Sequence, residues 1–183
     1  MGVHESQSRI MENQLGRSEA FSEWLFKKFL DYFGDIGIED SASFYKSINS
    51  VKNGFIRTES DELQYSLHIL LRYRLEKWLI DGHLNADDLE YVWNEEFAKD
   101  FGLSIKYPSD GVLQDVHWSE GLFGYFPTYS LGNVYAGCLF EAMQNQLVSL
   151  NKNLKIGNLS EATEWLSSSV HQHGSLYSPI ELI

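Results

Sequence analysis

The chain has 183 residues, of which 43% are apolar, so it is long enough for one domain with a substantial buried core. Aromatic residues make up 14% of the chain, which argues against disorder because so many large rings need a packed environment. The net charge is −12, and no cluster of Lys and Arg forms a basic stripe, so we expect no nucleic-acid partner.

No apolar segment approaches the length of a membrane span, and the first residues lack the basic-then-apolar pattern of a signal peptide. We therefore expect a cytoplasmic protein with no membrane partner. The one cysteine, Cys138, excludes an internal disulfide. Its apolar neighbours predict a free thiol that packs as a small core residue.

Helical spacing of apolar residues begins near the N-terminus. Apolar residues at intervals of three or four predict a helix that Ser18 caps and that ends at about Phe33, before Gly34. A shorter helix follows, with Asp40 or Ser41 as its cap. The first 50 residues are thus predicted to be mostly helical.

Three short segments are rich in residues that favour strands. Residues 55–58 follow the turn-forming pair Asn53-Gly54, and residues 105–107 and 112–116 have a similar composition. We expect these segments to form a small antiparallel β-sheet, with Arg57 at the end of the first strand.

The remaining elements are predicted to be helices joined by loops. Ser60 is expected to cap a helix that ends at Gly82 and carries one apolar stripe of Leu63, Leu67, Leu70, Leu71, Leu75, Trp78 and Leu79. Further helices are expected from Asn85 to Gly102, from Leu131 to about Leu150, and from Ser160 onward, with an aromatic loop at residues 121–129. The predicted fold is mainly α, in a single domain covering residues 1–183.

Three motifs follow one another along the chain. They are His4-Glu5-Ser6-Gln7, Ile56-Arg57-Thr58-Glu59-Ser60-Asp61, and Gly111-Val112-Leu113-Gln114-Asp115-Val116-His117-Trp118. Together they resemble the C-terminal part of the carboxypeptidase Taq family of zinc-dependent metallocarboxypeptidases. The resemblance implies half of a helical zincin-like fold, and an enzyme that removes C-terminal amino acids from peptides.

The resemblance also implies roles for individual residues. It makes Glu5 the third zinc ligand, although Glu5 would also suit an exposed helix start. It places Arg57, Gln114 and Asp115 at the substrate, where the Arg57 fork could bind a peptide carboxylate. The alternative for Arg57 is a structural ion pair with Asp61 or Glu59.

The same resemblance suggests hydrogen-bond donors for the oxyanion that peptide hydrolysis creates. His117 is the first candidate, with Tyr125 or Tyr129 as the second. The alternative for both tyrosines is that they only pack within the aromatic loop.

One part of the family's site is missing from these 183 residues, because the sequence contains no His-Glu-x-x-His motif. Two zinc ligands and the general base are therefore absent. We expect the chain alone to bind no zinc and to be inactive. It would then be an expressed part, one half of a split enzyme with a complementing N-terminal half, or a noncatalytic helical interaction module. Uncovered apolar faces would favour a homodimer or a complex.

Overall fold

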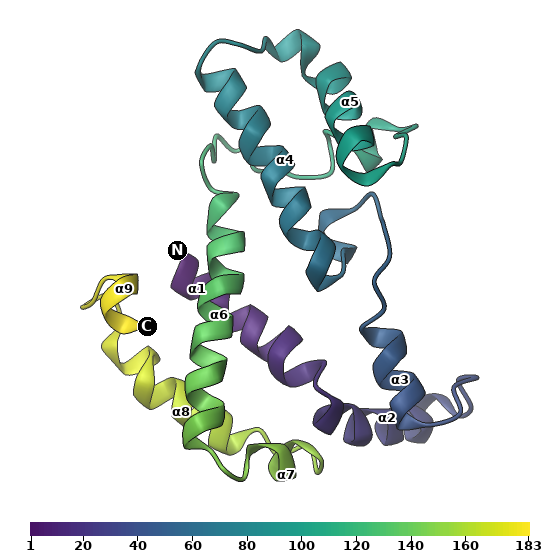
Figure 1. Ribbon diagram of the computed structural model, residues 1–183, viewed down its shortest axis with the longest axis vertical. Coiled ribbons are helices and arrows are strands. Elements are labelled where there is room, and N and C mark those ends of the chain that lie inside the picture. The colour runs from purple at the N-terminus through teal and green to yellow at the C-terminus, as the bar shows by residue number, and fades with distance from the viewer. The chain divides into compact units, whose positions relative to one another are not determined.

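The computed structural model describes all 183 residues, and its regular elements are all helices (Figure 1). The chain forms two compact units. The first contains Met1–Ser50 and Leu131–Ile183, and the second contains Val51–Ser130. The longest helix, α6 (Pro127–Gln146), begins in the second unit and continues into the first. No helix of the chain combines the length and the apolar character that a membrane span requires.

The first unit packs short helices around the greater part of α6. Its other elements are α1 (Gly2–Arg9), the π-helix η1 (Ile10–Gly16), α2 (Glu19–Phe33), α3 (Ser41–Ile48), α7 (Leu150–Leu154), α8 (Ser160–Ser169), the 3₁₀-helix η5 (His171–His173) and α9 (Pro179–Leu182). Its core is made by buried apolar side chains from these helices: Ile10, Leu15, Ala136, Leu139, Met143, Leu154 and Leu166.

The sequence correctly predicts the limits of α2 and the start of α3 in this unit, whereas the helix expected from Leu131 to about Leu150 spans Pro127–Gln146. The Ser18 hydroxyl accepts a hydrogen bond from the Phe21 N–H, and α2 ends before Gly34. The Asp40 carboxylate, rather than Ser41, caps α3 by accepting from the Ser43 N–H. A side-chain oxygen at this position satisfies a backbone donor that the first helical turn leaves unpaired.

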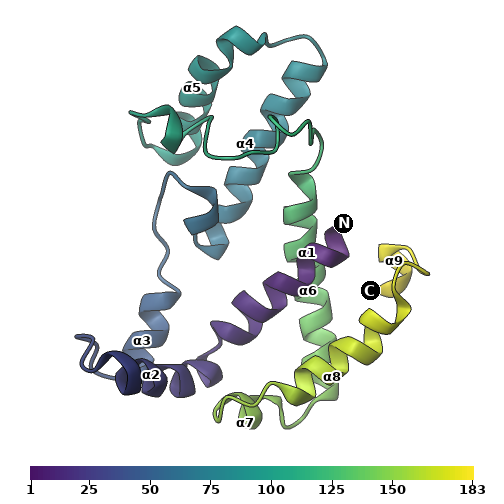
Figure 2. The ribbon, with the colours of Figure 1, turned by 180° about the vertical axis from the view of Figure 1, so that it is seen from behind.

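The second unit is built on two long helices, α4 (Glu62–Ile80) and α5 (Leu89–Phe101), which lie side by side in both ribbon views (Figures 1 and 2). Three 3₁₀-helices accompany them: η2 (Arg57–Glu59) precedes α4, η3 (Ala86–Asp88) lies between α4 and α5, and η4 (Pro108–Asp110) follows α5. Between α4 and α5 lies a buried apolar cluster of Leu71, Leu75, Trp93, Phe97 and Phe101. Glu96 of α5 pairs with Arg74 of α4 at the edge of this contact.

The predicted antiparallel sheet is wrong, because the three segments form 3₁₀-turns and irregular chain. The Gln114 side chain replaces the partner strand. Its carboxamide oxygen accepts from the Arg57 N–H at 2.8 Å, and its amide nitrogen donates to the carbonyls of Phe55 at 3.1 Å and Asp110 at 3.0 Å. The backbone groups that would pair in a sheet are therefore satisfied by one side chain. In a strand, Leu113 and Val116 would point to opposite faces, and one of them would be buried. In the structure both are exposed.

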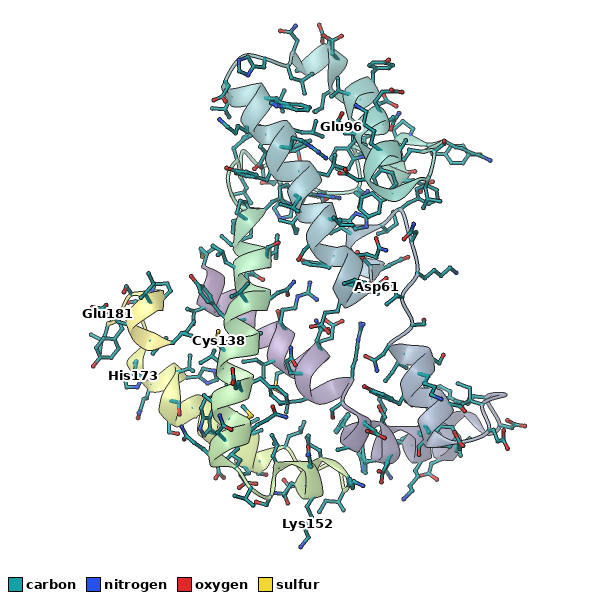
Figure 3. The ribbon with its side chains drawn as sticks, viewed as in Figure 1. Asp61, Glu96, Cys138, Lys152, His173 and Glu181 are labelled. Atoms are coloured by element: carbon teal, nitrogen blue, oxygen red, sulfur yellow. The ribbon has the colours of Figure 1, made fainter.

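Three further local predictions need correction. Asp61, not Ser60, caps α4, because its carboxylate accepts from the N–H groups of both Gln64 and Lys52. Helix α6 begins at Pro127, a residue whose fixed backbone angle suits the first helical turn, so Tyr129 lies on a helix and not in a loop. Cys138 lies on the exposed side of α6 and is not a core residue (Figure 3).

Candidate active site

The buried face of α4 carries polar side chains that hold the irregular segment leading to α6. Tyr65, His68, Arg72 and Glu76 are spaced by three, four and four residues, so they share one face of the helix, and all are buried. Three of them bond to residues outside α4, and those contacts build the candidate site. In this way a helix, rather than a sheet, holds residues 115–124 at three points, Asp115, Trp118 and Gly124.

At the centre of the site, the Asp115 carboxylate lies between two arginines. Oδ1 accepts from Nε and Nη2 of Arg57 at 3.0 and 2.7 Å, and Oδ2 accepts from Nε of Arg72 at 2.6 Å. Arg57 also donates to the Tyr65 hydroxyl at 3.0 Å. Asp115 and Tyr65, rather than Asp61 or Glu59, are thus the partners of Arg57.

The ionisation of this cluster follows from burial and charge together. Burial by itself would raise the pKa of Asp115, but the charges and hydrogen bonds of Arg72 and Arg57 outweigh it and hold that pKa below its ordinary value. Burial lowers the pKa of Arg72 to about 10, which still leaves the guanidinium charged at neutral pH. The two arginines exceed one carboxylate by one positive charge.

Aromatic rings cover the surplus positive charge. The Arg57 guanidinium carbon lies 4.9 Å from the ring centroid of Tyr129, and that of Arg72 lies 4.8 Å from the ring of Trp93. The negative face of an aromatic ring attracts a cation at such distances, most strongly where water is excluded. The rings therefore help to keep both guanidinium groups buried.

His117 connects the charged cluster to the aromatic residues at the start of α6. Its Nε2 lies 2.9 Å from the Tyr129 hydroxyl, and its Nδ1 lies 3.8 Å from Oδ1 of Asp115. The imidazole packs against the rings of Phe126 and Tyr125, with centroids 4.3 and 5.6 Å away. The imidazole is thus held from both edges and on its face.

The structure brings together six of the seven predicted site residues. Arg57, Gln114, Asp115, His117, Tyr125 and Tyr129 form one continuous set of contacts within the second unit. Sequence reasoning missed the contributions of Tyr65, Arg72 and Glu76. Their signal was available, because long polar side chains at helical spacing along one face of an apolar helix need partners.

The seventh predicted residue, Glu5, belongs to the first unit and lies half-buried on α1. There α1 approaches α6 closely, since a Cβ atom at Gly132 would come within 2.8 Å of the Glu5 Cβ atom. No group of three His, Cys, Asp or Glu side chains in the chain is arranged to hold a metal ion. A structural or catalytic zinc site needs at least three protein ligands, so the residues present do not form one by themselves.

The fold and these motif residues are those of a helical metallopeptidase, and the comparisons identify the family. The model of the carboxypeptidase Taq (M32) metallopeptidases matches residues 1–183. The chain is 42% identical to thermostable carboxypeptidase 1 of Thermus thermophilus over 186 residues, which covers all of this chain and 36% of that protein. It is 39% identical to carboxypeptidase 1 of Bacillus subtilis, covering all of this chain and 37% of that protein. The chain therefore belongs to the carboxypeptidase Taq (M32) family.

Solved structures agree with this assignment. Metallocarboxypeptidase 1 of Trypanosoma cruzi superposes with a TM-score of 0.90 at 41% identity, over 99% of this chain and 38% of that one. The M32 carboxypeptidase of Deinococcus radiodurans gives a TM-score of 0.90 at 36% identity, over 99% of this chain and 37% of that one. The chain thus spans little more than a third of the length of the relatives it matches.

Proposed function

We propose that the chain supplies one wall of the active site of a zinc-dependent metallocarboxypeptidase, which removes C-terminal amino acids from peptides. The observation that carries the proposal is the bonded network of the second unit. Arg57 comes from one family motif and Asp115 and His117 from another, and the network joins them although 58 positions separate Arg57 from Asp115 in the sequence. Exposed polar residues without a shared role would not be expected to form a buried network that joins two distant motifs.

In this proposal, His117 and Tyr129 stabilise the oxyanion. Hydrolysis of a peptide places negative charge on the former carbonyl oxygen, and donors fixed in advance lower the energy of that state. The 2.9 Å contact between His117 Nε2 and the Tyr129 hydroxyl fixes both groups, and Tyr125 supports the imidazole from its face. In this contact one of the two groups donates to the other, so the contact must open for both to donate to the oxyanion, while packing against Tyr125 keeps the imidazole in place.

We assign Arg57, Gln114 and Asp115 to the substrate side of the site, where two roles for Arg57 make different predictions. Arg57 is only 7% exposed and is bonded to Asp115, so it is well placed to position the segment that carries His117. If it also binds the substrate carboxylate, Arg57→Lys should mainly raise KM, because an ammonium lacks the two-pronged fork. If Arg57 only positions the segment that carries His117, the same substitution should mainly lower kcat and the stability of the protein.

We propose Glu5 as one ligand of the zinc ion, with the other ligands provided by residues outside these 183. The zinc ion, when bound, would polarise the substrate carbonyl and a water molecule. By itself, one carboxylate holds zinc weakly, so the 183-residue chain should bind zinc no more tightly than its Glu5→Gln variant does. The same chain should release no amino acid from a blocked dipeptide.

The outer face of α4 supports association with a second polypeptide surface, either a complementing N-terminal half or a second copy. Leu63, Leu67 and Leu70 lie along this helix and are all exposed. Such a contiguous apolar surface is unusual on an isolated soluble protein. Light scattering should therefore give a mass above that of one chain, and Leu67→Glu with Leu70→Glu should return it to the mass of one chain.

A segment exchange tests the proposed function. These 183 residues replace the aligned segment of the Thermus thermophilus carboxypeptidase, and the release of C-terminal residues from a blocked dipeptide is measured. We expect an active chimera in which His117→Gln and Tyr129→Phe each lower kcat/KM about a hundredfold, in line with the loss of one oxyanion donor. Glu19→Gln, an exposed carboxylate on α2, is the matched control. A folded chimera whose activity does not depend on His117 would refute the assignment.

A further inference from the structure

The second unit contains a cavity that the proposed peptidase function does not use. It has a volume of about 260 Å³ and lies between the C-terminal half of α4 and the turn at Phe123 and Gly124. Apolar side chains of Tyr73, Ile80 and Phe123 line it, and each of them is exposed at the protein surface. A small molecule could therefore enter from solvent.

One wall of this cavity is a buried carboxylate without a counter-charge. Glu76 is 4% exposed and also lines the cavity. Its Oε1 accepts from the Trp118 indole N–H at 2.8 Å, and its Oε2 accepts from the Gly124 N–H at 3.2 Å. Each carboxylate oxygen has two lone pairs, so both oxygens retain the capacity to accept another hydrogen bond.

The two hydrogen-bond donors to Glu76, an indole and a backbone amide, carry no charge. Burial raises the pKa of Glu76, and the only groups that oppose this effect are the Trp118 and Gly124 donors. The cation that lines the cavity, Lys77, is bonded to Asp81 at 2.6 Å. Burying a carboxylate costs free energy unless a cation is paired with it. A cationic ligand would therefore supply the counter-charge that Glu76 lacks.

The backbone at Gly124 is shaped for this contact. Gly124 has a φ of +78°, a conformation that side-chain-bearing residues rarely adopt, and this turn points its N–H at Glu76. Trp118 stacks on Phe123 with ring planes 12° apart, which places a flat aromatic wall next to the carboxylate. Both features hold Glu76 in place without neutralising it.

We propose that this cavity binds a small organic amine, with its ammonium group at Glu76 and its apolar body between Tyr73, Ile80 and Phe123. The aromatic wall adds to the binding of such a ligand, because a ring face attracts a cation. The net charge of −12 raises the local concentration of cations over that of anions. A metal ion does not suit the site, since Glu76 is its one buried carboxylate and no group of three donors surrounds it.

Nuclear magnetic resonance of the ¹⁵N-labelled chain tests the proposal, because the two donors to Glu76 are both observable. Benzylamine is titrated against the Trp118 indole N–H, assigned with Trp118→Phe, and the Gly124 amide. We expect both signals to shift and to saturate with a Kd on the order of 1 mM, which is typical of a ligand with so few atoms. Benzyl alcohol, which has the same shape without the charge, should shift them at least tenfold more weakly.

Two variants and one control complete the test. Glu76→Gln should weaken benzylamine binding about tenfold or more, in line with the loss of a charged hydrogen bond. Phe123→Ala should weaken benzylamine binding without changing the carboxylate. This variant tests the proposal even if Glu76→Gln does not fold. Glu90→Gln, an exposed carboxylate on α5 that does not line the cavity, should have little effect. Equal binding of benzylamine and benzyl alcohol, or no binding of either up to roughly 50 mM, about fifty times the expected Kd, would overturn the proposal.

Discussion

The strongest prediction concerns Asp115, because two buried arginines depend on this single carboxylate. Asp115→Asn keeps the shape of the side chain but removes its charge, which leaves Arg57 and Arg72 without a counter-ion. Breaking a buried ion pair by removing one partner costs about 3–5 kcal/mol of unfolding free energy. A domain is typically stable by only about 5–15 kcal/mol, so the variant should lose a large part of its stability.

Urea unfolding followed by tryptophan fluorescence measures this loss. With a denaturant slope of about 2 kcal/mol per molar, a loss of about 4 kcal/mol lowers the midpoint by roughly 2 M. Asp81→Asn removes an exposed carboxylate from a surface pair with Lys77 and serves as the control, with no resolvable shift expected. A midpoint for Asp115→Asn that matches the wild type would refute the reasoning.

A second variant separates the cost of an unpaired charge from other effects. Arg72→Met removes one of the two buried guanidinium groups and keeps most of the side-chain volume. In the Asp115→Asn background, this change should restore part of the lost stability, because it leaves one unpaired buried cation instead of two. Simple addition of the two losses would show that the charges of Asp115 and Arg72 are not coupled.

Three further predictions test other contacts. Burial, reinforced by the charges of Arg72 and Arg57, lowers the pKa of His68 from 6.5 to about 4, so protonation of His68 favours the unfolded chain. The free energy of unfolding should therefore fall by about 3 kcal/mol as the pH drops from 6.5 to 4. The urea midpoint of His68→Phe should lack this dependence on pH. Gln114→Leu removes the partner of three backbone groups, and we expect about 1–3 kcal/mol of destabilisation with faster hydrogen exchange at the Arg57 amide; unchanged exchange there would contradict the role of the carboxamide. Gly132→Ala should destabilise the first unit by about 1–3 kcal/mol in thermal unfolding, because the new Cβ atom would meet Glu5. Gly137→Ala, on the same helix, faces open space and should be neutral or slightly stabilising. Equal effects of the two substitutions would refute the close approach of α1 to α6.

The helices were largely predictable because their signals are local. Ser18 and Asp40 cap the helices that follow them, and Gly102 ends α5 as the sequence indicates. The apolar stripe of α4 was only partly right. Leu71 and Leu75 are buried, whereas Leu63, Leu67 and Leu70 are exposed. Periodicity shows that a helix has an apolar face but does not tell which neighbour covers that face.

The sheet could not be excluded from the sequence because its replacement is a long-range contact. The local composition around Phe55 favours a strand, and nothing nearby shows that the Gln114 side chain will satisfy the Phe55 and Arg57 backbone groups. The same limitation applies to the site. The motifs indicated His117 and Asp115, but the role of Arg72 depends on how α4 meets the segment before α6. Tertiary contact overrides local propensity in both cases.

The metal content of the chimera tests the central claim most directly. Zinc per molecule is measured by elemental analysis after dialysis, for the segment exchange into the Thermus thermophilus carboxypeptidase and for its Glu5→Gln and His117→Gln variants. If this chain provides one metal ligand and a separate set of oxyanion donors, Glu5→Gln should lose the zinc, while His117→Gln should keep it and lose only activity. A Glu5→Gln chimera that retains one zinc and full activity would contradict the claim.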